Sequence, residues 1–130
     1  MNDSDCDKIR EWLTNLVGLT MSTARRAADM RVLHFGPMTD RDGGSVGEFA
    51  LHIQCPWRIE NADGIITGRS DLWEPIHRTD GFSYDNWDYH RDGNLQDKLI
   101  NQLVDRPDEF RVRSIDVNRN GSFSIDLSDD

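Results

Sequence analysis

The longest regular alternation of apolar and polar residues runs from residue 49 to residue 59. Its apolar positions are Phe49, Leu51, Ile53, Cys55, Trp57 and Ile59. Because a strand turns successive side chains to opposite faces, this pattern predicts one long, half-buried strand. Pro56 cannot donate a hydrogen bond to a neighbouring strand, so it predicts a bulge or a sheet edge. Turn residues at 61–64 then predict a hairpin whose partner strand is 65–68.

Helical spacing of apolar residues occurs twice. The first helix is predicted at residues 5–17, with a stop at Gly18, and its apolar positions are Cys6, Ile9, Trp12, Leu13, Leu16 and Val17. The second is predicted at residues 95–105, with Asn94 as its cap and Pro107 beyond its end. Its apolar positions are Leu95, Leu99, Ile100, Leu103 and Val104. Both apolar stripes are predicted to face a core.

Further strands are predicted at residues 30–35, 110–117 and 122–127. The loop 37–45 is expected to join 30–35 to the long strand as a hairpin, and Asn120-Gly121 is a strong signal for a turn between the last two strands. Residues 19–28 are ambiguous, with a short strand near 19–21 as one alternative. The fold predicted for residues 1–130 is a single α+β domain. It has one antiparallel sheet of about five or six strands and two helices mainly on one face.

Residues 71–93 follow no helical or strand period, although they contain Trp73, Phe82, Tyr84, Trp87 and Tyr89. Long irregular segments are uncommon in compact domains and often carry function. Two interpretations stay open: the rings cover an edge of the core, or they bind a ligand or a partner. We expect Trp73 to be mostly buried and Trp87 to be the more exposed of the two.

The formal net charge is −9, from 24 acidic and 15 basic residues. This charge disfavours nucleic-acid binding and is compatible with a basic protein partner, or simply with solubility. No apolar run reaches the roughly 20 residues of a membrane span, and the start lacks a signal-peptide core, so a cytoplasmic protein without membrane association is predicted. Cys6 and Cys55 are expected to be buried thiols.

Motifs for catalysis and metal binding are weak. Residues 116–121 match the first half of a calcium loop, but Leu127 stands where the loop needs a bidentate glutamate, and a hairpin turn explains the same residues. The four histidines and two cysteines have no zinc-site spacing, and no nucleophile elbow, phosphate loop or dinucleotide fingerprint occurs. We therefore expect no metal, no cofactor and no identifiable catalytic residue.

The polar side of the long strand supplies the candidate binding residues. His52, Gln54 and Arg58 share this face, and Arg69 and Asp71 follow the return strand. A solvated sheet face explains them as well as a binding surface does. The candidate residues for a ligand or a partner are therefore His52, Gln54, Arg58, Arg69, Asp71 and Trp87.

Four stretches of the chain carry a resemblance. They are RAADMRVLHFG at 26–36, ALHIQCPWRI at 50–59, GIITGRSDLW at 64–73 and NLQD at 94–97. Together they resemble a family of small uncharacterised bacterial proteins, over most of the chain from Trp12 onward. The resemblance implies one folded unit and carries over no catalytic residue.

The function that these observations favour is non-enzymatic. We expect a small acidic cytoplasmic protein that binds another protein, like an immunity or antitoxin factor. The alternative is an enzyme or small-molecule-binding protein with a pocket between residues 71–93 and the polar face of strand 49–59. A homodimer formed through an unprotected edge strand is the third option.

Overall fold

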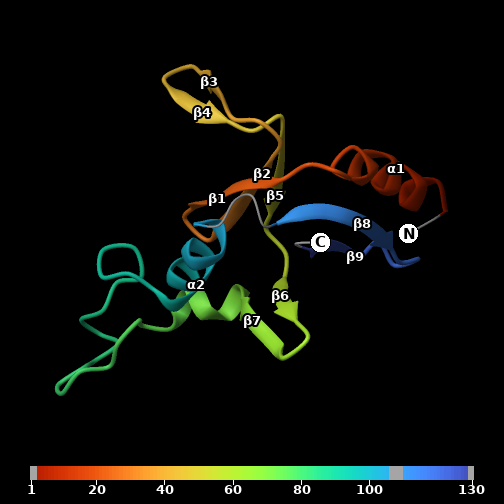
Figure 1. Ribbon diagram of the computed structural model, residues 1–130. Helices are drawn as coiled ribbons and strands as arrows, with labels where there is room; N and C mark the ends of the chain where they lie inside the picture. The colour runs from red at the N-terminus through yellow and green to blue at the C-terminus, as the bar shows by residue number, and fades with distance from the viewer. Residues whose placement is uncertain (1–2, 106–109, 129–130) are drawn as a thin grey trace. The chain divides into compact units, whose positions relative to one another are not determined.

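The computed structural model describes residues 3–105 and 110–128 (Figure 1). Among them are two α-helices, α1 (Asp3–Thr14) and α2 (Leu95–Val104), and one 3₁₀ helix, η1 (Arg69–Trp73). The strands are β1 (Met21–Ala27), β2 (Met30–Phe35), β3 (Thr39–Arg41), β4 (Gly44–Val46), β5 (Phe49–Ile53), β6 (Arg58–Asn61), β7 (Gly64–Gly68), β8 (Arg111–Val117) and β9 (Phe123–Ser128). The α+β class and the antiparallel pairing are confirmed. Pro107, the predicted end signal of the second helix, lies outside the described residues.

The predicted single sheet of five or six strands is wrong. The strands form one three-stranded sheet, in the order β1-β2-β5, and three separate pairs, β3-β4, β6-β7 and β8-β9. The predicted strand 49–59 is interrupted after Ile53 and resumes at Arg58. Pro56 lies in this gap, where its missing N–H would have broken a continuous ladder. Cys55, in the same gap, is exposed and not buried as predicted.

The described chain forms two compact units. The first contains residues 3–23, 33–51 and 110–128, and the second contains Ala24–Val32 and His52–Asp105. The two helices pack on different sheets, α1 on β8 in the first unit and α2 on β7 and η1 in the second. The prediction that both helices cover one face is therefore wrong, whereas the prediction of one domain for the whole chain stays a prediction.

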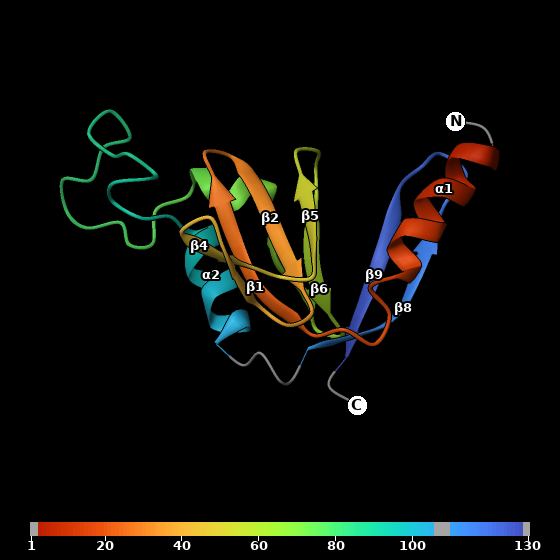
Figure 2. The same ribbon diagram turned by 90° about the horizontal axis from the view of Figure 1, so that it is seen from above.

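In the first unit, α1 lies along the β8-β9 hairpin in both views of the ribbon (Figures 1 and 2). Its buried residues are Cys6 and Leu13, followed by the buried Leu16 just past its end. Trp12 and Val17, predicted in the buried stripe, are exposed instead. The Cys6 thiol lies 3.4 Å from the carbonyl oxygen of Asn118, so α1 is tied to the turn of the hairpin.

The second unit combines the β6-β7 hairpin, η1 and α2. The turn predicted at 61–64 is present, with Asn61 opposite Gly64 in the antiparallel pair. Leu72 of η1 and Ile100 of α2 are each almost fully buried and form part of the core of this unit. Between η1 and α2, residues 74–94 form no helix or strand, whereas residues 71–73, predicted to be irregular as well, belong to η1.

Within residues 3–105 and 110–128, neither α1 nor α2 is long and apolar enough to cross a membrane.

Candidate functional site

The six predicted site residues all lie in the second unit. His52, Gln54, Arg58 and Arg69 are exposed, whereas Asp71 and Trp87 are half-buried. Three of them take part in hydrogen bonds or ion pairs with residues outside the predicted set. Arg58 Nε lies 3.0 Å from Glu60 Oε2, Asp71 Oδ2 accepts a hydrogen bond from Thr67 Oγ1 at 2.9 Å, and the Arg69 carbonyl accepts one from Gln96 Nε2 at 3.2 Å. The Arg58 and Asp71 side chains therefore contact residues only two and four positions away, whereas Arg69 accepts through its backbone from Gln96, 27 residues later.

A different cluster organises the second unit, at the first turn of α2. Asn94 caps the helix, since its Oδ1 accepts a hydrogen bond from the backbone N–H of Asp97 at 2.8 Å. Asn94 Nδ2 donates in return to Asp97 Oδ2 at 3.0 Å, so cap and third helical residue satisfy each other. The acidic Asp97 also lies at the positive end of the helix dipole.

Asp97 holds two arginines from the β1-β2 hairpin. Arg26 Nη2 lies 2.9 Å from one carboxylate oxygen, and Arg31 Nη2 lies 2.7 Å from the other. Arg31 is only 2% exposed, it also donates to Gln96 Oε1, and its Nε is buried with no hydrogen-bond partner in the described structure. One carboxylate thus compensates two guanidinium groups that are largely removed from water.

The pKa values of this cluster follow from burial and pairing. Burial acts to raise the pKa of Asp97, but the hydrogen bonds from Arg26, Arg31 and Asn94 together hold that pKa below its usual range. The hydrogen bond to Asp97 raises the pKa of Arg26, whereas burial lowers that of Arg31, because Arg31 is the more buried arginine. Both arginines remain charged at neutral pH.

The same cluster ties down both ends of the irregular segment. The backbone carbonyl of Glu74 accepts a hydrogen bond from the backbone N–H of Leu95 at 2.8 Å, and the Tyr89 carbonyl accepts one from Asn94 Nδ2 at 3.1 Å. The Arg26 guanidinium carbon lies 5.2 Å from the centre of the Tyr89 ring, a cation–π distance. Residues 74–94 are therefore a loop anchored at its base on α2, hereafter the aromatic segment.

Large rings are exposed on and beside the aromatic segment. Trp73, at the end of η1, is 51% exposed although its ring packs edge-on against Tyr89 at 5.0 Å. Tyr84 is also 51% exposed and stacks edge-on with both Phe82 and Trp87. The predicted order is wrong, because Trp73 is exposed and Trp87 is half-buried among other rings.

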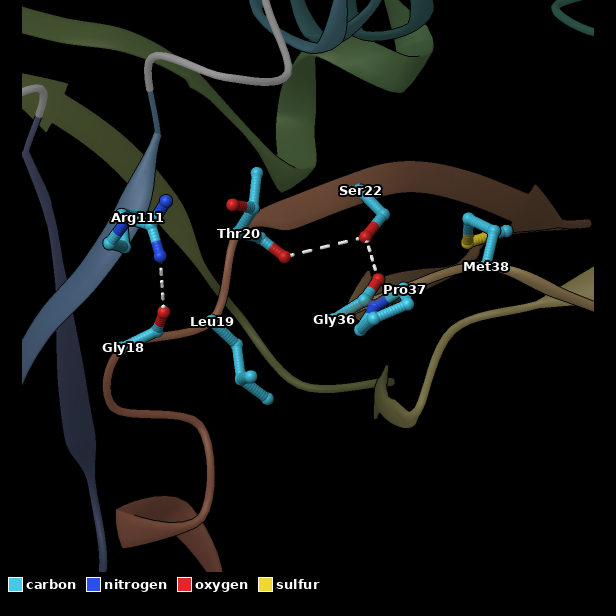
Figure 3. A pocket seen from close by; sticks show the side chains of 8 residues that line it. All are labelled: Gly18, Leu19, Thr20, Ser22, Gly36, Pro37, Met38 and Arg111. Atoms are coloured by element: carbon cyan, nitrogen blue, oxygen red, sulfur yellow. Dashed lines mark hydrogen bonds between the residues drawn. The ribbon is translucent and has the colours of Figure 1, made fainter.

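A hollow of about 500 Å³ lies in the first unit, and none of the predicted site residues lines it (Figure 3). Leu19, Pro37 and Met38 contribute apolar lining, and Arg111 borders it with one guanidinium nitrogen donating to the Gly18 carbonyl at 2.8 Å. The hollow is broadly open. None of its lining residues comes from strand 49–59 or residues 71–93, between which the alternative function, an enzyme or small-molecule-binding protein, would need a pocket.

Metal ligands do not converge in the part of the chain that the structure describes, since no group of three or more His, Cys, Asp or Glu side chains lies close enough together to hold an ion. The turn at 118–122, which resembles half of a calcium loop, is a hairpin turn. Its Asn120 Oδ1 accepts hydrogen bonds from the backbone N–H and the hydroxyl of Ser122.

Searches for similar proteins matched the chain to no family model, no curated protein and no solved structure. The resemblance to a family of small bacterial proteins therefore stays a prediction.

Sequence reasoning missed the cluster around Asp97. Asn94 and Asp97 carried a local signal, a cap followed by an acid at the third helical position. Arg26 and Arg31, by contrast, lie 71 and 66 residues from Asp97. In the sequence they resemble residues of a solvated strand face. A charged residue of a strand can be buried only if a residue of opposite charge from another element lies beside it. The sequence around the strand does not show whether such a residue is present.

Proposed function

We propose that this chain is a small acidic, cytoplasmic, non-enzymatic protein that binds a basic protein partner, in the manner of an immunity or antitoxin factor. Its contact surface is the aromatic segment together with Trp73. The observation that carries the proposal is the exposure of two large rings, each at 51%: Tyr84 on a loop anchored at its base, and Trp73 directly before that loop at the end of η1.

Exposed aromatic side chains on a pre-positioned loop suit a binding surface. Trp, Tyr and Arg are the residue types most enriched among binding hot spots, because they bury much area with few rotatable bonds. Trp73, Tyr84 and Arg78 bring all three types together in one stretch of chain. The anchoring on α2 lowers the entropy that the loop loses on binding.

Charge supports a basic partner. Residues 71–93 contain six acidic residues and two arginines, so the stretch carries a formal charge of −4 within a chain of −9. Such a potential steers a cationic protein toward the loop and repels nucleic acid. Residues 71–93 contain no lysine, and arginine is the basic residue that suits an interface better.

Affinity capture from native lysate tests the proposal with three tagged baits. The wild-type chain should retain a protein that the double variant Trp73→Ala/Tyr84→Ala loses. Ile65→Ala is the matched control, because Ile65 is an exposed apolar residue, at 68%, on β7 of the same unit. Retention of the same proteins by all three baits would contradict the proposal. Circular dichroism melts of the baits establish that each is folded.

A further inference from the structure

The aromatic segment binds the guanidinium group of one of its own residues, Arg78. The Arg78 guanidinium carbon lies 5.4 Å from the centre of the Tyr84 ring and 5.9 Å from that of Phe82. Arg78 Nη2 also donates to the Tyr84 hydroxyl and lies 3.0 Å from Glu74 Oε2. Two rings, a hydroxyl and a carboxylate thus surround one cation within eleven residues of sequence.

These four groups match the chemistry of guanidinium recognition. A guanidinium is planar and weakly hydrated, so it can lie against aromatic rings while its edge donates to a carboxylate. An ammonium group is compact and strongly hydrated, and it gains less from such rings. The arrangement therefore favours arginine over lysine.

The occupant is held loosely enough to exchange. Both the Arg78 and the Glu74 side chains are well exposed, and an exposed ion pair between residues i and i+4 contributes little to stability. The segment as a whole does not depend on this contact, since its two ends are fastened by Leu95 and Asn94. Arg78 can therefore leave without releasing the loop from α2.

We infer that Phe82, Tyr84 and Glu74 form a guanidinium-binding site, which Arg78 fills in the unbound chain and which an arginine side chain of the basic partner fills in the complex. This inference rests on the proposed function and names the chemistry of its contact. The net charge of −4 around residues 71–93 supplies the attraction that lets an incoming cation compete with Arg78.

The experiment uses two variants that change charge equally. Arg78→Ala empties the site, whereas Arg91→Ala removes the same charge from the same segment but leaves the rings occupied, because Arg91 pairs with Asp92 at 2.8 Å. The probe is the peptide acetyl-Gly-Arg-Gly-amide, with its lysine analogue for comparison. Binding is followed by NMR chemical-shift titration of the ¹⁵N-labelled full chain at residues 74, 82 and 84.

Removing Arg78 should tighten binding of the arginine peptide several-fold relative to both wild type and Arg91→Ala. An exposed contact worth up to about 1 kcal/mol keeps the site occupied most of the time, and the apparent affinity of a competing ligand is reduced by the fraction of time that the site is free, up to about fivefold. The lysine peptide should bind the Arg78→Ala variant several-fold more weakly. Adding Tyr84→Ala to Arg78→Ala should abolish the gain.

Equal affinity of the Arg78→Ala and Arg91→Ala variants would overturn the inference, because the gain would then come from charge alone. A purely structural role for Arg78 would also overturn it: Arg78→Ala and the longer Arg78→Gln would both disturb the resonances of 80–87 and gain no binding. Failure of the proposed function is distinguishable. In that case the peptide would bind the variants as described here, but the double variant Trp73→Ala/Tyr84→Ala would capture the same proteins from lysate as the wild-type chain does.

Discussion

Replacing Asp97 by asparagine removes the one carboxylate that compensates Arg26 and Arg31, with almost no change in shape. The Arg31 side chain is only 3% exposed, so it would stay buried without a counter-charge. Loss of one member of a buried ion pair costs about 3–5 kcal/mol. The Asp97 side chain itself is 28% exposed, and water screens part of the attraction. We therefore expect Asp97→Asn to lower the free energy of unfolding by about 2–4 kcal/mol.

Urea unfolding at pH 7 measures this loss. Asp85→Asn is the matched control, because it makes the same chemical change at an exposed position of the aromatic segment, and it should leave the unfolding midpoint unchanged. If the two variants unfold at the same urea concentration, the ion-pair cluster does not hold the second unit together and the reasoning is wrong.

The pH dependence of the same variant gives a second check. The pKa of Asp97 is lowered in the folded chain, so its contribution to stability is fully present above the unfolded pKa of about 3.9 and is lost as the pH falls through the folded pKa. The stability difference between wild type and Asp97→Asn should thus be largest near neutral pH and shrink below about pH 4. An equal difference at pH 7 and pH 3 would show that the carboxylate charge is irrelevant.

Two further predictions concern the cores. Leu13→Ala and Ile100→Ala, one in each unit, should each cost about 2–5 kcal/mol, and in differential scanning calorimetry both should lower one shared transition; two separate transitions would contradict the predicted single domain. Gly47→Ala places a Cβ atom 2.9 Å from Cβ of His34 and 3.0 Å from the Phe35 carbonyl oxygen, so it should cost about 1–3 kcal/mol. Gly43→Ala, strained at φ +83° but with open space, should cost about 1 kcal/mol, and equal midpoints in urea would refute the close approach at Gly47.

Local signals predicted the elements of this fold well. The strand at 30–35 has the predicted bounds, and the hairpin turns at Asn61–Gly64 and Asn120-Gly121 lie where turn residues placed them. The second helix begins after Asn94 as expected, because the cap is chemistry between near neighbours. Such features depend on a few adjacent residues, which is why sequence alone reveals them.

The assembly of these elements was harder to predict. The alternation of apolar and polar residues at 49–59 continues past Pro56, but this alternation does not reveal whether the residues belong to one strand or to two. In the structure the strand ends at Ile53, and Arg58 begins a new hairpin. Strand β1 contains Arg25 and Arg26, whose charges hid it in an ambiguous stretch. Arg26 is accommodated only because Asp97, 71 residues later, meets it. Long-range pairing of charges has no local signature.

The affinity of the purified partner for defined variants tests the central claim, that Trp73 and the aromatic segment form the contact surface. Isothermal titration calorimetry would compare the wild-type chain with Trp73→Ala, Tyr84→Ala and the control Ile65→Ala. A hot-spot ring contributes about 2 kcal/mol or more, so Trp73→Ala or Tyr84→Ala should raise Kd by about 30-fold or more. Ile65→Ala should change it by less than about threefold. Dissociation constants that stay within threefold for all three variants would contradict the claim.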